Sequence, residues 1–349
     1  MKILQVGLGG FGRFHLEAWL QLGVRDSLWV CDLSAERRAF AERAGMAPDH
    51  IMSNWESMLP QVDVVDIVTP TDSHFALCQA ALQQGKDVFV EKPMTMTSGQ
   101  AVELAELCEQ DDRRLQVGYY YRYHPMTLRL LSLIEQDRFG AIRYLTGNFC
   151  GFKRARTDVG VTHADAIHFL DLFNALTGSA PQDVFAVTRD HFNRGLEDFS
   201  VVLLTYPSGA VAKVESGYVQ PGRRRDQVVP GAMTTKEITL VGARATAEVD
   251  FENQTLLVHE VHHELRQGVW AAVVGETVSV PIEVCSPVQL VARELQDFLD
   301  TVRTRQPARV GPRESGVALA RLIEAIYESA RTQSRVVLTA EAGVASSAS

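Results

Sequence analysis

The strongest constraint on the fold is a glycine-rich turn that follows the first apolar run of the chain. The run Ile3–Val6 is continuous and apolar, and Gly7, Gly9 and Gly12 follow it in the spacing G-x-G-x-x-G, before a helical pattern. Glycines so placed permit a tight turn, a close approach of the backbone to a pyrophosphate, and close packing of helix on strand. The helix N-terminus then offers free N–H groups to the phosphates. The turn therefore predicts a dinucleotide-binding βαβ unit.

An acidic residue stands where such a unit binds the ribose of its cofactor. Asp32 ends the second apolar run, 20 residues after Gly12, and a carboxylate there can bind the ribose hydroxyls. The same carboxylate repels a 2′-phosphate, so NAD is predicted in preference to NADP. Arg37 and Arg38 lie one helical turn further on and leave NADP possible.

Residues 1–121 repeat the alternation of short apolar runs and helical patterns. Continuous apolar runs are typical of parallel strands that are covered on both faces. The pattern predicts an α/β Rossmann domain with a doubly wound parallel sheet. The expected strands are Ile3–Val6, Leu28–Cys31, Val62–Val68, Val88–Val90 and Leu115–Val117, and the expected helices include Ser34–Ala44 and Ser73–Gln84.

Residues 122–349 change to strands joined by short turns, which predicts an α+β domain with a largely antiparallel open sheet. Tyr206 to Gly209 (Tyr-Pro-Ser-Gly) is a hairpin signal between two of these strands. The small, polar tail Ala340–Ser349 is expected to fray. The expected helices are Met126–Gln136, Thr162–Leu176, Val288–Arg303 and Glu314–Ser329, and the expected strands are Val184–Arg189, Phe199–Tyr206, Val211–Gly217, Ile238–Val241, Ala247–Phe251 and Thr255–Val261.

Length and composition agree with two domains and exclude several classes of partner. The 349 residues carry 34 Lys and Arg against 43 Asp and Glu, a net charge of −9, which argues against a nucleic-acid partner. No apolar run approaches the ~20 residues that span a membrane, and the N-terminus lacks a signal-peptide pattern. The five cysteines are scattered and never form a C-x-x-C pair, which is typical of reduced thiols. These features predict a cytoplasmic protein.

Further motifs follow the ends of the later strands. Thr69-Pro-Thr-Asp-Ser-His74, Glu91-Lys-Pro93 and Gly118-Tyr-Tyr-Tyr-Arg-Tyr-His-Pro125 come in this order, and Ile167-His168 and Asp171 follow. With the glycine turn, they resemble the glucose-fructose oxidoreductase / inositol dehydrogenase (Gfo/Idh/MocA) family over nearly the whole chain. The closing helices and Asp158-Val-Gly-Val161 look most like the branch that oxidises nucleotide sugars, such as UDP-N-acetylglucosamine 3-dehydrogenases.

The resemblance implies an NAD-dependent dehydrogenase or reductase that acts on CH–OH groups of a sugar, nucleotide sugar or cyclitol. It also implies an active site between the domains and assembly into a homodimer or homotetramer. Two alternatives stay open. One is a redox-neutral lyase or glycosidase of the same family that keeps its NAD bound, and the other is a non-catalytic NAD-responsive binding protein.

Lys92 and His168 are the expected catalytic residues. Lys92 follows the carboxyl end of a parallel strand, where open sheets bind ligands, and its ammonium can stabilise a developing alkoxide or relay a proton. The resemblance gives Lys92 this role and places His168 beside the nicotinamide. Histidine has the intrinsic pKa to move a proton near neutral pH.

The chain departs from the family pattern next to His168. Many relatives carry an Asp four residues before this His, where this chain has Ala164. Asp165, three residues before His168, is the third expected catalytic residue, and it is predicted to approach His168 or the substrate. The competing outcome is that Asp165 faces away and that His163 or water fills the space. No metal is expected at this cluster, although its residue types could bind one.

The remaining expected site residues belong to the cofactor and the substrate. Thr69 could instead cap a helix, and His74 could be a surface residue. The tyrosines around Tyr121 could offer hydroxyls and stacking faces to a sugar or simply fill the interior. The expected cofactor contacts are Gly7, Gly9, Gly10, Phe11, Gly12, Asp32, Thr69, Pro70, His74 and Glu91, and the expected substrate contacts are Tyr121, Arg122 and Arg156.

Overall fold

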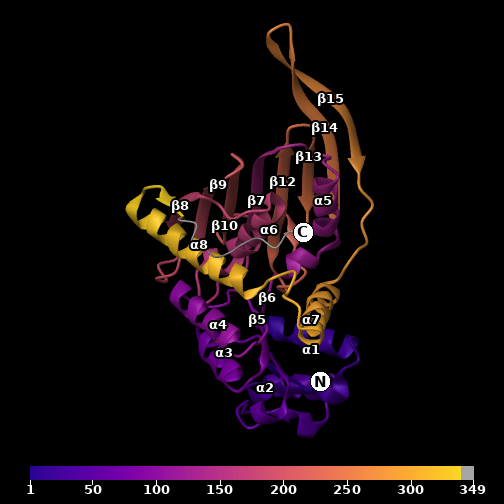
Figure 1. The fold of residues 1–349 in the computed structure, drawn as a ribbon, viewed down its shortest axis with the longest axis vertical. Helices are drawn as coiled ribbons and strands as arrows, with labels where there is room; N and C mark the ends of the chain where they lie inside the picture. The colour runs from indigo at the N-terminus through magenta and orange to yellow at the C-terminus, as the bar shows by residue number, and fades with distance from the viewer. Residues whose placement is uncertain (339–349) are drawn as a thin grey trace. The chain divides into compact units, whose positions relative to one another are not determined.

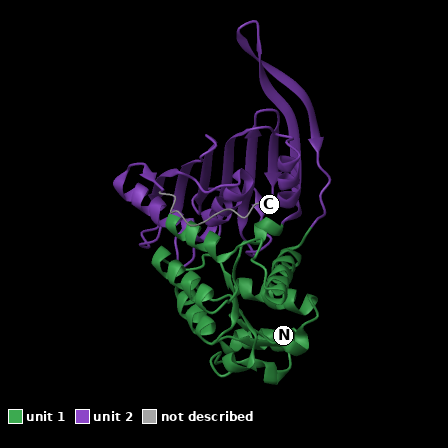
Figure 2. Ribbon diagram, in the orientation of Figure 1, with its two compact units in different colours: residues 1–123, 285–321 green, residues 124–284, 322–349 purple. Residues whose placement is uncertain are grey.

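The computed structural model describes residues 1–338, which form two compact units (Figure 2). Unit 1 combines Met1–Tyr123 with Cys285–Arg321, and unit 2 combines His124–Val284 with the residues from Leu322 onwards. The expected division at residues 121 and 122 therefore differs from the observed one, because residues 285–321 return to unit 1. The tail for which fraying was expected lies outside the described residues. Among the helices of residues 1–338, none combines the length and the apolar character that a membrane span needs.

Unit 1 is built on a six-stranded parallel sheet in the order β3-β2-β1-β4-β5-β6 (Figure 1). The side chains of β1, β4 and β5 are buried along their whole length, as expected of a parallel sheet covered on both faces. This topology confirms the predicted Rossmann domain. The strands are β1 (Ile3–Val6), β2 (Leu28–Cys31), β3 (Ile51–Met52), β4 (Val64–Ile67), β5 (Asp87–Glu91) and β6 (Leu115–Gly118).

One helix of unit 1 comes from far along the chain. Helix α7 packs against α1 and β5, and its side chains Val291, Leu295 and Phe298 join the hydrophobic core that contains Leu16 and Trp19. The apolar face of a helix can pack on either unit, so the sequence did not predict that α7 belongs to unit 1. The helices of unit 1 are α1 (Gly10–Gln21), α2 (Ala35–Arg43), α3 (His74–Gln83), α4 (Ser98–Gln110) and α7 (Pro287–Thr304).

Unit 2 is built on one large mixed sheet whose main order is β15-β14-β13-β12-β7-β10-β9-β8-β16, with β11 paired to β12. Among the described pairings of this second sheet, only that of β7 with β10 is parallel, so the predicted, largely antiparallel sheet is confirmed. The strands are β7 (Ile142–Phe152), β8 (Asp183–Arg189), β9 (Phe199–Thr205), β10 (Val211–Gly217), β11 (Arg224–Arg225), β12 (Met233–Gly242), β13 (Thr246–Asp250), β14 (Thr255–Arg266), β15 (Val269–Ser279) and β16 (Val336–Val337).

The predictions for this sheet were correct at one hairpin turn and incomplete for its strands. The hairpin turn was predicted correctly, since the Tyr206 N–H donates to the carbonyl of Ala210 at 2.9 Å and Gly209 has a φ of 85°. Strands β7 and β15 were missed. Strand β15 pairs with β14 to form a long, exposed hairpin that extends beyond the neighbouring strands (Figure 1). Its exposure removes the buried alternation by which a strand is recognised in sequence.

The helices of unit 2 include the segment that carries His168. Helix α6 packs against β7 and β10, and a π-helical turn, Thr162–Ala166, precedes it. The sequence predicted a single regular helix over this stretch. The helices are α5 (Pro125–Glu135), α6 (Ile167–Thr177) and α8 (Arg313–Thr332), the last of which contains the boundary between the units.

Candidate functional site

The glycine turn after β1 has the shape and the free donors that a pyrophosphate needs. Gly7 has a φ of 106°, and a Cβ there would lie 2.5 Å from the carbonyl oxygen of Val68. Gly9 is the N-cap of α1, where no side chain caps the helix and no acidic residue stands in the first turn. A Cβ at Gly10 would meet nothing within 4 Å. The helix N–H donors and the open space therefore fit the phosphates of NAD.

Asp32 is tied to this turn by its carboxylate. Its Oδ2 accepts a hydrogen bond from the Leu8 N–H at 2.8 Å, and its Oδ1 accepts one from the Ser34 N–H at 2.8 Å. The Arg37 guanidinium lies 3.5 Å from the same Oδ2 and also lies near Gly9. Asp32, the residue predicted to bind the ribose, is thus held beside the glycine turn, with the Arg37 guanidinium next to it.

The turn after β4 is held by His74, which is buried and not a surface residue. Its Nε2 lies 2.9 Å from the carbonyl oxygen of Thr69, and its Nδ1 lies 2.8 Å from that of Pro93. The hydroxyl of Thr69 accepts a hydrogen bond from Ser73 Oγ at 2.6 Å. Because both ring nitrogens face protein carbonyls, His74 links the turn after β4 to the turn after β5.

The turn after β5 carries Lys92. Glu91, which was predicted to contact the cofactor, directs its buried carboxylate into unit 1, where Oε1 lies 3.3 Å from His15 Nε2. Its Oε2 accepts a hydrogen bond from the Lys92 N–H at 3.2 Å. The Lys92–Pro93 peptide bond is cis. Lys92 therefore follows a strand end whose last side chain is anchored in the interior.

Unit 2 places His168 in a buried aromatic and charged cluster. The His168 ring stacks on Phe149 of β7 with the ring centroids 5.6 Å apart and the planes 18° from parallel. Asp165 forms an ion pair with Lys153, with Nζ and Oδ1 2.6 Å apart, and both side chains are buried. The Lys153 ammonium also lies 4.8 Å from the centroid of the Phe149 ring. The Phe149 ring thus brings the His168 imidazole together with the buried Lys153–Asp165 pair.

His163 takes a different direction. Its Nδ1 lies 2.9 Å from the Tyr327 hydroxyl on α8, which donates a hydrogen bond to Glu197 at 2.8 Å. Because Thr162–Ala166 is a π turn, the α-helical spacing by which Asp165 was assigned does not apply across it.

The expected substrate contacts lie in both units. In unit 1, the buried Tyr121 ring lies 4.4 Å from that of Tyr120, centroid to centroid, and Arg122 is half-buried. In unit 2, Arg156 donates from Nε to Asp158 Oδ1 at 2.9 Å, within the same loop.

Sequence reasoning missed Tyr218, which follows β10. Its hydroxyl is buried, and its ring centroid lies 5.7 Å from the Lys153 ammonium. Burial, together with the charge of Asp165, raises the pKa of Tyr218 above its ordinary range. No local motif marks this tyrosine, because its neighbours come from distant parts of the chain.

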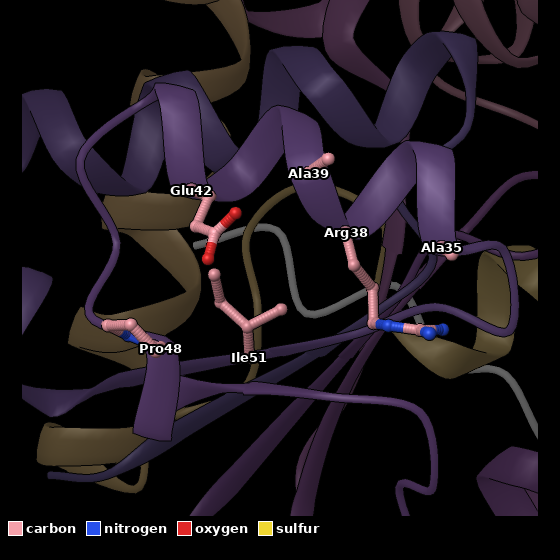
Figure 3. Close-up of a pocket in the computed structure, with 6 residues that line it drawn as sticks. All are labelled: Ala35, Arg38, Ala39, Glu42, Pro48 and Ile51. Carbon is pink, nitrogen blue, oxygen red and sulfur yellow. The ribbon is translucent and has the colours of Figure 1, made fainter.

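A hollow of about 250 Å³ lies beside α2, lined by Ala35, Arg38, Ala39, Glu42, Pro48 and Ile51 (Figure 3). None of the predicted cofactor contacts lines it. The donors of the glycine turn, and not this hollow, therefore define the candidate cofactor site.

Two family models match the chain. One, described as an oxidoreductase family with an NAD-binding Rossmann fold, matches residues 1–119, and the second, the C-terminal alpha/beta domain of the same family, matches residues 132–338.

Individual relatives resemble the chain over most of its length. UDP-N-acetylglucosamine 3-dehydrogenase of Acidithiobacillus ferrooxidans is 29% identical over 310 residues, which are 88% of this chain and 90% of that protein. D-xylose 1-dehydrogenase (NADP(+)) 2 of Haloferax volcanii is 28% identical over 316 residues, 87% of this chain and 89% of that protein. The solved structure of the A. ferrooxidans enzyme has a TM-score of 0.77 at 26% identity, and the match covers 95% of this chain and 98% of that one.

Proposed function

Because the chain belongs to the Gfo/Idh/MocA family of oxidoreductases, we propose that it transfers a hydride between NAD and a hydroxyl or keto carbon of a sugar, nucleotide sugar or cyclitol. One observation in unit 1 carries the proposal. The glycine turn, the Thr69 turn and the Lys92 turn follow β1, β4 and β5, which are neighbours in the parallel sheet. Their carboxyl ends meet at one edge, where such sheets bind ligands. The named relatives that act on a nucleotide sugar and on xylose support the substrate class.

The side chains divide the chemistry among themselves. Bound NAD supplies the hydride acceptor. Lys92 stabilises negative charge on the substrate oxygen as the hydride leaves, and His168 takes or returns the hydroxyl proton. Tyr121, Arg122 and Arg156 bind the substrate. Asp165 holds Lys153 against Phe149, the ring on which His168 stacks.

A substrate screen tests this function. Sugars, nucleotide sugars and inositols are offered with NAD, and the corresponding ketones with NADH, while NADH absorbance is followed. Net oxidation or reduction of one class supports the proposal. Product formation with tightly held NAD and no net NADH change would instead indicate the lyase or glycosidase alternative. NAD binding without turnover on any substrate would indicate a binding protein.

Cofactor choice is expected to depend on Asp32. The Asp32→Ser variant loses the carboxylate that binds the ribose hydroxyls, so its affinity for NAD should fall about tenfold. It also loses the charge that repels a 2′-phosphate, so its affinity for NADP should rise. Fluorescence titration with both cofactors measures the two affinities. Asp32→Asn is the matched control, because it keeps an acceptor for Leu8 N–H without the charge. Tighter binding of NADP than NAD by the unaltered protein would refute the assignment, and Arg37 would then be the residue to test.

The outer face of the unit 2 sheet is proposed to join two copies of the chain. Tyr144 on β7 and Val211 on β10 are directly paired, and Leu203 on β9 points to the same face, with all three exposed. Light scattering coupled to size-exclusion chromatography should show a dimer or tetramer that the double variant Leu203→Glu/Val211→Glu converts to monomer. A monomeric unaltered protein would exclude this interface.

A reducing compartment such as the cytoplasm suits the cysteines. All five thiols are buried. Burial raises the pKa of Cys31 to about 11 and that of Cys150 to about 12. Thiols in this state are inert and need no disulfide partner.

A further inference from the structure

Unit 1 buries four ionisable side chains behind the turn that carries Lys92. They come from four elements: His15 from α1, Asp66 from β4, Glu91 from β5 and Glu294 from α7, and none is more than 6% exposed. Burying charge is costly unless each group is paired or neutralised. We call these four residues the His15 cluster.

Two members of the cluster flank the imidazole. Asp66 lies 3.0 Å from His15 Nδ1 and also accepts a hydrogen bond from Trp19 Nε1 at 2.7 Å. Glu91 lies 3.3 Å from His15 Nε2. An imidazole donates to acids at both nitrogens only when it is protonated. Burial opposes that charge, but the charges and hydrogen bonds of Asp66 and Glu91 outweigh it and raise the pKa of His15 to about 10. His15 is thus a cation between two acids.

Glu294 adds a third acid that this cation does not neutralise. One of its oxygens, an oxygen of Glu91 and a ring nitrogen of His15 all lie within 4.8 Å of one another. Both oxygens of Glu294 are buried and have no hydrogen-bond partner within residues 1–338. Burial first, and then the charge of Glu91, raise the pKa of Glu294 well above its ordinary value of 4.5. The folded protein thus favours the neutral form of Glu294, whose O–H would be a donor next to Glu91.

Glu91 connects the cluster to the backbone of Lys92. Its Oε1 faces His15, and its Oε2 accepts the Lys92 N–H. Gly118 on the neighbouring strand β6 leaves room for the carboxylate, which a Cβ at that position would strike. The carboxylate of Glu91 therefore joins the His15 cluster to the backbone at Lys92.

We propose that Glu294 is a positioning residue that acts as a donor to Glu91, together with His15, and thereby helps to fix the backbone from which Lys92 acts. The inference rests on the proposed function, because it takes Lys92 to be catalytic. Its first test does not need activity, so the two can fail separately.

The first test is thermal unfolding of the NAD-bound protein against pH, for the unaltered chain and for Glu294→Gln. A carboxyl whose pKa is higher in the folded state keeps a proton that the unfolded chain releases, so folding loses stability as the pH rises above about 4.5. Glutamine has no proton to lose. The melting temperature of Glu294→Gln relative to the unaltered protein should therefore climb steadily from pH 5 to pH 8.

The pH range and a control variant separate the titration of Glu294 from that of the neighbouring groups. The other titratable groups that face it are His15, Asp66, Glu91, Asp297 on its own helix, and Tyr123. Measurements below pH 8 stay below the pKa of about 10 that His15 has in the folded protein. Asp300→Asn makes the equivalent change at an exposed position of α7 and should show no such slope. A flat difference for Glu294→Gln would mean that Glu294 is ionised in the folded protein, which would overturn the proposal.

The second test separates positioning from mere packing. Glu294→Leu fills similar space without a donor, and its kcat should fall about ten- to a hundred-fold while its KM for NAD stays within twofold. Glu294→Gln, which restores a donor, should recover most of that kcat. Equal losses in both variants would leave Glu294 with a packing role only. A stoichiometric metal in the purified protein, with loss of activity on chelation, would also overturn the proposal, because the cluster would then bind a cation in place of the proton.

Discussion

Replacing Lys92 with methionine should lower kcat by about two orders of magnitude or more, while the affinity for NAD changes little. Methionine keeps the length of the side chain and removes the ammonium that would stabilise the developing alkoxide. The backbone of the turn is held independently, through the Lys92 N–H bond to Glu91 and through the His74 contact to the Pro93 carbonyl. Steady-state kinetics with the substrate found in the screen, and NAD titration of the same preparation, provide the two readouts.

Lys86→Met is the matched control for this variant. Lys86 precedes the amino end of β5, at the opposite end of the strand from Lys92. Its loss removes the same charge from the same unit and should leave kcat unchanged. If Lys92→Met retained full turnover, the charge of Lys92 would have no part in the reaction, and His168 would have to carry the proton chemistry without it.

Replacing Asp165 with asparagine should destabilise the protein by about 3–5 kcal/mol, because it leaves the Lys153 ammonium buried without its counter-ion. Chemical denaturation measures this loss. Turnover should fall as well, and beyond what the lost stability explains, because the pair stands against the ring that stacks on His168.

A double variant separates the two effects. Lys153→Met/Asp165→Leu replaces the buried pair with apolar side chains of similar volume, which often restores stability. If stability returns and kcat stays low, the charges of the pair serve the reaction. If kcat returns together with stability, the pair is structural, and His168 works without the carboxylate of Asp165.

Helical spacing could not predict the position of the Asp165 side chain relative to His168. A residue three positions before His168 lies on the same face of a regular α-helix. The structure inserts a π turn at Thr162–Ala166 and gives Asp165 a partner on the segment after β7. Neither the turn nor Lys153 could be inferred from the intervals between the residues of α6.

Glu91 shows a second limit. Its place beside Lys92 predicts a cofactor contact, and that stays a prediction. What the sequence did not indicate is that the side chain points toward His15 in the interior of unit 1. The partners of Glu91 come from α1 and α7, and Glu294 stands 203 residues further along the chain. Local sequence cannot identify a pair separated by that distance.

The sequence by itself determined the features that depend on short-range spacing. The glycine turn after β1, the acid at the end of β2 and the Lys92 turn after β5 are encoded by residues next to one another, and the apolar runs determined the parallel sheet. Only the tertiary structure decided that α7 returns to unit 1, that Asp165 pairs with Lys153, and that the His15 cluster forms behind Glu91. The physical reason is that an apolar helix face or a buried charge fits many partners, and only the packing of distant segments selects one.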